Sequence, residues 1–324
     1  MKILLIRVSS LGDVLHNLPL VDDLHRHYPD AQIDWVVEEA YVSLLQLHPG
    51  IRRIIPYAQR RWRKHLGQAA VRQEIRGFIQ TLRSESYDLI LETQGLLKTG
   101  IILGLAKKAP GGRKIGLANG TAGSGYEGIS RIFHDQSIAT DPYTHAVDRG
   151  RLVAAKAIGK ELNTPASFGL LPPSLEAPWK PAGSYIVFFH GTAGAAKKWA
   201  RTNWIALAAK LASTDMPVLL PWGNEEEKKE AEAMAAAIPQ ASVLPKLSMM
   251  DAVLLAQSAR LAIGVDTGLT HIAAAYETPT VEIYTASPRW KTEGNWSPRI
   301  RNTGDAGKIP SVDEVYAAAM ELLN

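Results

Sequence analysis

Aspartates occupy two positions where a short apolar run passes into a turn and then into a helical pattern. Asp13 follows the turn at 8–12, and Asp266 follows the apolar run at 261–265. In a parallel sheet such turns lie at the carboxyl edge, where ligands bind near the first N–H groups of a helix. Asp13 can therefore act as a general base on a hydroxyl substrate, and Asp266 can accept hydrogen bonds from sugar hydroxyls. Helix capping is the simpler alternative at both turns.

Two loops have the features of phosphate sites. In the turn after Asp266, the N–H groups of Thr267 and its next two residues meet the positive end of a helix, which suits a diphosphate. The loop at 190–199 contains Gly and Thr and ends in two lysines, of which Lys197 can neutralise a departing diphosphate. This loop lacks the ending of a Walker A motif, and a lysine pair alone is commonly solvated surface.

Two charged segments are further candidates. Acidic residues at 225–227 begin a helical pattern, where they complement the helix dipole, although one glutamate could bind a ribose hydroxyl. The stretch 40–73 holds seven Lys or Arg and no Asp or Glu. Within it, the segment 60–64 (Arg-Arg-Trp-Arg-Lys) favours recognition of an anion, because a guanidinium group can donate two parallel hydrogen bonds to a carboxylate or phosphate. A solvated helix face with a buried tryptophan is the alternative.

Composition excludes several classes of protein. The chain has 324 residues, 46% hydrophobic and 21% charged, which is typical of a globular protein and excludes disordered and collagen-like ones. The absence of cysteine excludes disulfides, thiolate catalysis and Cys-ligated metals. A net charge of +4 does not indicate a general nucleic-acid binder. No apolar run approaches the ~18–20 residues of a membrane span, and no signal-peptide cleavage site follows the first strand, so we expect a cytoplasmic protein.

Two further patterns carry no chemistry. Residues 123–128 match a dinucleotide-binding pattern, but they do not stand between a strand and a helix. The nine histidines include no His-Glu-x-x-His motif and no cluster with ligand spacing, so no catalytic metal is indicated.

The elements that must position these residues follow an alternation of strands and helices, which predicts an α/β protein with parallel sheets. Strands are predicted at 2–8, 33–37, 53–56, 89–92, 114–117, 185–190, 218–221, 242–244, 261–265 and 280–284. Helices are predicted at 14–27, 71–84, 146–158, 204–212, 226–237, 250–256, 269–276 and 312–323.

A proline-rich segment divides this alternation into two halves. Five prolines fall within 163–183, which indicates an interdomain linker. We therefore predict two Rossmann-like domains, 1–162 and 184–310, that face each other across a cleft and bind ligands at the carboxyl ends of their strands. The last helix, within 311–324, could pack on either domain, including back on the N-terminal one.

Taken together, the motifs resemble the bacterial lipopolysaccharide heptosyltransferase family over nearly the whole chain. The resemblance rests on Ser9-Ser10-Leu11-Gly12-Asp13-Val14-Leu15-His16, Asp34-Trp35-Val36-Val37-Glu38-Glu39, Arg60-Arg61-Trp62-Arg63-Lys64, Gln94-Gly95-Leu96, His145-Ala146-Val147-Asp148-Arg149, Lys197-Lys198-Trp199, Leu220-Pro221-Trp222-Gly223 and Val265-Asp266-Thr267-Gly268-Leu269-Thr270-His271. It implies a GT-B architecture. It also implies an inverting enzyme that transfers L-glycero-D-manno-heptose from ADP-heptose to the Kdo region of lipid A.

The resemblance also implies a role for each matching residue. Asp13 would be the base acting on the acceptor hydroxyl, and Lys197 would meet the donor phosphates. The other donor-binding residues would be Asp266 for the heptose, Thr267, Gly268 and His271 for the pyrophosphate and sugar, Glu227 for the ribose, and Thr192. Two residues depart from the family pattern: Ala193 replaces a second Thr, and Leu247 replaces a Met near the adenine. The acceptor's Kdo and phosphate groups would meet Arg60, Arg61, Arg63 and Lys64.

These implications define the expected partners. They are ADP-heptose and, at the membrane surface, Kdo-lipid A. We expect the protein to be a monomer on the inner face of the inner membrane, and we expect no cofactor, metal or nucleic acid. Three alternatives remain: an enzyme that adds the second heptose, a GT-B nucleotide-sugar epimerase, and a non-enzymatic protein that binds anionic glycolipids. The basic segment favours the first heptose, because Kdo carboxylates are the charges nearest to that step.

Overall fold

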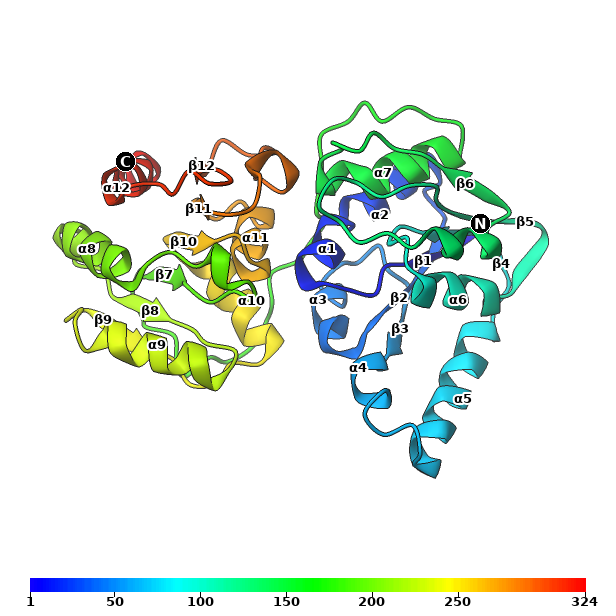
Figure 1. The fold of residues 1–324 in the computed structure, drawn as a ribbon, viewed down its shortest axis with the longest axis horizontal. Coiled ribbons are helices and arrows are strands. Elements are labelled where there is room, and N and C mark those ends of the chain that lie inside the picture. Colours follow the sequence, from blue (N-terminus) through cyan, green and yellow to red (C-terminus); the bar gives the residue numbers. More distant parts are fainter. The chain divides into compact units, whose positions relative to one another are not determined.

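The computed structural model describes residues 1–324, which form two compact units, Met1–Leu171 and Pro172–Asn324. Each unit contains a six-stranded sheet in which every strand pairing is parallel, with helices packed on the sheet (Figure 1). This confirms the predicted α/β fold with two Rossmann-like domains of the GT-B architecture.

The sheet of the first unit has the strand order β3-β2-β1-β4-β5-β6. Its order reverses between β1 and β4, which is where ligands bind in open α/β sheets. β1 is almost wholly apolar and buried, as expected of a strand with helices on both faces. The strands are β1 (Lys2–Ile6), β2 (Gln32–Glu38), β3 (Arg53–Tyr57), β4 (Tyr87–Glu92), β5 (Lys108–Leu117) and β6 (Gln136–Ile138).

One predicted helix of the first unit is divided in the structure. The helix predicted at 14–27 is two helices, because Pro19 begins a new helix and cannot donate the backbone bond that a continuous one needs. The helical elements are α1 (Leu11–His16), α2 (Pro19–His27), η1 (Glu39–Tyr41), α3 (Val42–Leu45), α4 (Gln59–Trp62), α5 (Ala69–Arg83), α6 (Leu97–Leu105), η2 (Gly128–Phe133) and α7 (Ala146–Ala157).

The second unit repeats this plan with the strand order β12-β11-β10-β7-β8-β9, which reverses between β10 and β7. The strands are β7 (Ile186–Phe189), β8 (Val218–Leu220), β9 (Ala241–Val243), β10 (Leu261–Val265), β11 (Thr280–Tyr284) and β12 (Ile300–Gly304). The helical elements are η3 (Ala195–Lys197), α8 (Arg201–Leu211), η4 (Ala212–Thr214), α9 (Glu225–Ala235), α10 (Met249–Ser258), α11 (Gly268–Ala275), η5 (Arg289–Lys291) and α12 (Val312–Leu323).

The segment predicted as a linker contains the boundary between the units, but its first part belongs to the first unit. Phe168 is buried, Ser167 donates to Asp22 at 2.5 Å, and Leu171 donates its N–H to the Leu47 carbonyl. The last helix, α12, packs against α8 and strands β10 to β12 of the second unit. Its Val315 lies in that unit's core. Of the two positions left open for this helix, the structure has the one on the second unit and not the one on the N-terminal domain.

Candidate functional site

The second unit places a chain of charged side chains where strand β10 ends. Asp266, the residue after β10, receives the Lys197 ammonium at 2.7 Å and faces His271 Nε2 at 3.0 Å. The other ring nitrogen of His271 faces Glu282 on β11 at 3.0 Å. Glu282 in turn accepts hydrogen bonds from the Tyr284 hydroxyl and the Gly294 N–H, both at 2.8 Å. The four charged side chains therefore form one continuous network at the carboxyl edge of the sheet.

His271 is a cation within this network. Both ring nitrogens face carboxylate oxygens, and both can donate only when the imidazole is doubly protonated. Burial alone would lower the pKa of His271, but Glu282 and Asp266 together raise it to about 10. Burial would also raise the pKa of Asp266, yet His271 and Lys197 hold it well below its ordinary value. Within the network, Asp266 is therefore ionised and His271 protonated at neutral pH.

The phosphate-type turn predicted after Asp266 is the N-terminal end of α11. Thr267 occupies the N-cap position but makes no side-chain capping bond, so it does not act as the cap that the simpler alternative supposed. Gly268 is the first residue of the helix. Because the first N–H groups of a helix have no acceptor inside it, this end is suited to an anion. His271 lies in the next turn of the same helix.

Lys197 comes from the other predicted phosphate loop. It is the last residue of the short helix η3, and its side chain is 39% exposed although its ammonium binds Asp266. Thr192 and Ala193 lie earlier in that loop, half-buried and exposed respectively. The structure therefore brings Lys197, Asp266, His271 and the start of α11 together.

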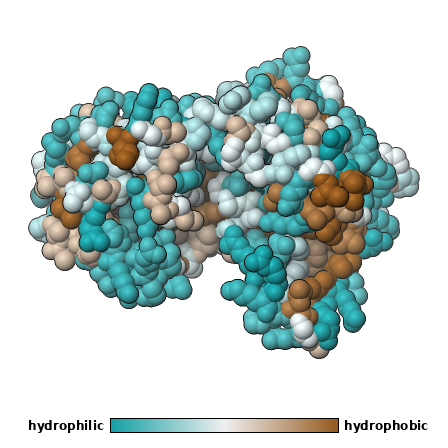
Figure 2. Space-filling view, in the orientation of Figure 1, coloured by the Kyte–Doolittle hydropathy of each residue, from teal (hydrophilic) through white to brown (hydrophobic).

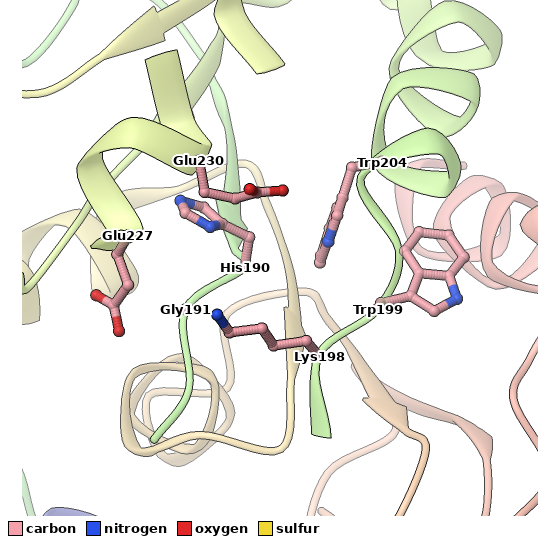
Figure 3. Close-up of a pocket in the computed structure, with 7 residues that line it drawn as sticks. All are labelled: His190, Gly191, Lys198, Trp199, Trp204, Glu227 and Glu230. Atoms are coloured by element: carbon pink, nitrogen blue, oxygen red, sulfur yellow. The ribbon is translucent and has the colours of Figure 1, made fainter. Parts of the chain in front are cut away.

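Glu227 lines a hollow of the second unit, which Figure 3 shows. The pocket is bounded by His190, Gly191, Lys198, Trp199, Trp204, Glu227 and Glu230. Glu227 stands in the first turn of α9 and accepts the Gly223 N–H at 2.7 Å. A Cβ on Gly191 would lie 2.7 Å from the Glu227 carboxyl carbon, so the glycine lets this carboxylate lie against the loop. Leu247 is half-buried just before α10 and does not line this pocket.

In the first unit, Asp13 lies where β1 ends, as predicted, but it is not the N-cap. Ser10 is the N-cap of α1, and Asp13 accepts hydrogen bonds from the Ser10 N–H at 3.0 Å and hydroxyl at 2.9 Å. Its other oxygen pairs with the Arg7 guanidinium at 2.6 Å. Burial would raise the pKa of Asp13, but Arg7, Ser10 and Arg149 hold it well below its ordinary value. Asp13 is therefore ionised at neutral pH, as a general base must be.

Three cations around Asp13 were given no role by the sequence analysis. Arg7 and Arg149 are buried, and the latter lies 3.9 Å from the Asp13 carboxylate. Lys98, near the start of α6, donates to the Ser9 hydroxyl at 3.1 Å, and burial lowers its pKa. Arg7 had a sequence signal, since it ends an apolar strand, and Arg149 lies in a motif of the family resemblance. Lys98 had none.

Two of the four cations in the basic segment 60–64 already have side-chain partners within the first unit. Arg61 pairs with Glu39 at 3.0 Å and Glu74 at 2.7 Å, the two acids that flank the acid-free stretch. Arg60 donates to the Tyr41 hydroxyl at 3.2 Å. Arg63 and Lys64 are exposed, and no acid pairs with their side chains. Trp62 packs in the core of the unit, as the alternative of a solvated helix face with a buried tryptophan supposed.

Two classes of feature are not found in the structure. None of its helices combines the length and apolar character that a membrane span requires. It also contains no group of three His, Cys, Asp or Glu side chains placed to bind a metal ion.

Comparisons with known proteins identify the family to which the chain is similar. The model of glycosyltransferase family 9 (heptosyltransferase) matches residues 75–318. Over 285 residues, the chain is 37% identical to lipopolysaccharide heptosyltransferase 1 of Pseudomonas aeruginosa, covering 88% of this chain and 78% of the relative. It is 33% identical to the Escherichia coli K12 protein of that name, covering 88% of each.

Solved structures show the same likeness in three dimensions. The structure of E. coli heptosyltransferase WaaC with ADP has a TM-score of 0.85 at 28% identity, covering 99% of this chain and 100% of that one. The same enzyme with ADP-2-deoxy-2-fluoro heptose has a TM-score of 0.80 at 29% identity, covering 99% and 98%.

Proposed function

Since this chain belongs to glycosyltransferase family 9, the heptosyltransferase family, we propose that it transfers L-glycero-D-manno-heptose from ADP-heptose to the Kdo region of lipid A. We further propose that the transfer inverts the anomeric carbon and adds the first heptose of the inner core. The relatives with 33–37% identity are all named for heptosyltransferase 1, which supports this step over the later one.

The observation that carries the proposal is the network of Lys197, Asp266 and His271 beside the free N-terminal end of α11. The helix end and Lys197 supply positive charge for a diphosphate, and Asp266 supplies a carboxylate for sugar hydroxyls. Glu227 supplies a second carboxylate for the ribose. In its relative WaaC, the bound ligands are ADP and an ADP-heptose analogue.

On the acceptor side, the proposal assigns Asp13 as the general base. The acceptor oxygen attacks the anomeric carbon and its proton passes to Asp13, while the bond from that carbon to the diphosphate breaks and ADP leaves. Lys197 and the first N–H groups of α11 stabilise the charge that develops on ADP. These groups do the neutralising, so the reaction is proposed to need no metal or cofactor.

The acceptor proposal rests on the basic segment. Arg63 and Lys64 are free to meet the Kdo carboxylates and lipid A phosphates, and Arg60 and Arg61 can join them by exchanging their present partners. Because this acceptor is anchored in a bilayer, we place the enzyme in the cytoplasm, peripheral on the inner membrane. A monomer suffices for this chemistry.

A nucleotide-sugar epimerase is the main alternative activity. Its support is two UDP-N-acetylglucosamine 2-epimerase structures, with TM-scores of 0.58 and 0.53 at 14% and 12% identity, which show a shared fold alone. Incubating the protein with ADP-heptose, with and without Kdo-lipid A, separates the two activities by mass spectrometry and NMR of the sugar. We expect ADP release coupled to acceptor glycosylation. Isomerisation of the sugar without acceptor would establish the epimerase instead.

A further inference from the structure

The first unit exposes large aliphatic side chains along one continuous surface. Figure 2 shows this surface in brown over α5 and α6. Its most exposed members are Ile132 at 70%, Ile129 at 57%, Leu66 at 55% and Ile101 at 44%. Contiguous exposed apolar patches of this kind mark an interaction site.

The surface includes a hollow between α5 and α6. It is lined by Tyr57, Gln59, Trp62, Arg63, Leu66, Ile75, Phe78, Ile79, Ile101, Ile102 and Leu105. Beyond it, η2 packs against α6, because Phe133 lies against the faces of Gly100 and Gly104, where a Cβ would come within 3.0 Å of its ring. This packing holds Ile129 and Ile132 of η2 next to α6. We call the exposed residues Leu66, Ile101, Ile129 and Ile132 the apolar face.

Cations are interleaved with the apolar face. Arg63 lines the hollow itself, Lys64 follows it in the chain, and Arg131 stands between the two exposed isoleucines of η2. All three are exposed, and none of their side chains pairs with an acid. Aliphatic side chains mixed with unpaired cations suit a partner that has a hydrocarbon interior and anionic groups at its surface.

We propose that the apolar face docks on an anionic lipid bilayer, with its aliphatic side chains entering the boundary between headgroups and acyl chains. A second copy of this chain fits less well, since a two-fold contact would bring the same cations of both copies together. This inference rests on the proposed function, because a lipid-anchored acceptor must be reached from the bilayer. The hollow and the segment 60–64 share Arg63, so docking would place the basic segment at the headgroups.

The test is co-sedimentation of the full chain with vesicles of phosphatidylglycerol and phosphatidylethanolamine, compared with pure phosphatidylcholine. The double variant Ile101→Ser/Ile132→Ser removes aliphatic surface without touching a proposed catalytic or acceptor-binding residue. Ile309→Ser, in the second unit, is the matched control, because Ile309 is 67% exposed. We expect the wild type and the control to bind anionic vesicles, and the double variant to partition about tenfold more weakly, as loss of buried aliphatic area predicts.

Activity on two forms of the acceptor separates this proposal from the proposed function. We expect the double variant to match the wild type on water-soluble, deacylated Kdo acceptor and to be slower on vesicle-embedded Kdo-lipid A. Equal vesicle binding by all variants, or none by the wild type, would overturn the bilayer assignment. So would a dimer in sedimentation equilibrium that the double variant abolishes. No transfer to either form of the acceptor despite normal vesicle binding would refute the proposed function and leave the docking surface standing.

Discussion

Single side chains in both candidate sites support the local structure and also have a proposed chemical role. Asp13 completes the cap of α1 with Ser10, and Lys197 is held by Asp266. A substitution can therefore reduce activity through folding or through chemistry.

Replacing Asp13 with Asn removes the negative charge but keeps an oxygen that can accept from Ser10. We expect a folded protein with nearly unchanged ADP-heptose binding and turnover lower by about 10²–10⁴, the range for loss of a general base. Steady-state kinetics and thermal unfolding measure the two effects. Ser10→Ala, which weakens the cap but keeps the carboxylate, should stay close to wild-type turnover. If folded Asp13→Asn also turns over normally, Asp13 has only the capping role.

Replacing Lys197 with Ala removes the cation proposed to meet the donor diphosphate. We expect a higher KM for ADP-heptose and a lower kcat, because the charge on departing ADP is less well stabilised. Lys210→Ala is the control, since Lys210 pairs with Asp313 on the α12 side of the same unit. Wild-type activity should also survive EDTA. A steep loss with EDTA that Mg²⁺ restores would contradict the metal-free mechanism.

Glu282→Gln removes one of the two carboxylates that keep His271 protonated. In the wild type, NMR should show a cationic His271 at pH 8, because its pKa is raised to about 10. A raised folded pKa stabilises the protein fully below the ordinary value of 6.5 and loses that effect as the pH rises toward about 10. The variant should be about 3–5 kcal/mol less stable near pH 6, with a smaller difference at pH 10. Wild-type titration of His271 near 6.5 would refute this account.

Sequence reasoning found most of the network but missed Glu282, and the reason is physical. Asp266 and His271 lie in one strand-to-helix turn, so their spacing predicts proximity. Glu282 lies on the neighbouring strand, and its contact depends on the pairing of β10 with β11. The available signal was a glutamate inside an otherwise apolar strand, since buried carboxylates are rare without a partner.

At the scale of elements, the sequence predicted the central strands and the edge strands β3 and β9, but it missed the other two edge strands. β1 and β10 are buried apolar runs that follow from composition alone. β6 and β12 were missed because edge strands are short, partly polar and defined by pairing. α6 was missed because Gly100 and Gly104 weaken a helical pattern, although they serve the close approach of Phe133.

The basic segment is an element-scale prediction, because its cations act together. Single alanine changes at Arg60, Arg61, Arg63 or Lys64 should be mild, as exposed charge pairs contribute about 0–1 kcal/mol each. Arg61→Ala should be the mildest for binding, since Glu39 and Glu74 already neutralise Arg61. The combined change should raise the acceptor KM strongly, leave the ADP-heptose KM nearly unchanged and flatten the salt dependence of acceptor binding.

The control for this set neutralises Arg83, Lys107 and Lys108, which lie where α5 ends and β5 begins. We expect it to leave both KM values unchanged. If the combined change in the basic segment instead weakens the donor while the acceptor KM holds, the donor and acceptor roles of the two units have been assigned the wrong way round.

At the scale of the whole molecule, each unit contributes one half of the proposed reaction. The first unit holds Asp13 and the basic segment, and the second holds the network around Asp266. Sequence reasoning predicted this division because each half repeats the same strand-to-helix turn, and because the family resemblance implies acceptor residues in the first half and donor residues in the second. In the structure, the sheet of each unit reverses its strand order once. Sequence reasoning left the position of α12 open, because an amphipathic helix at a chain end does not indicate which core it covers, and the structure packs α12 on the second unit.

The central claim is that the chain adds one heptose from ADP-heptose to Kdo-lipid A. The most direct measurement supplies Kdo-lipid A and its mono-heptosylated form in separate reactions with ADP-heptose, and follows kcat/KM for each by mass spectrometry. We predict a mass gain of one heptosyl residue on Kdo-lipid A, with one ADP released per transfer, and a much lower kcat/KM on the mono-heptosylated form. Transfer only to the mono-heptosylated form, or no transfer to either, would contradict the account.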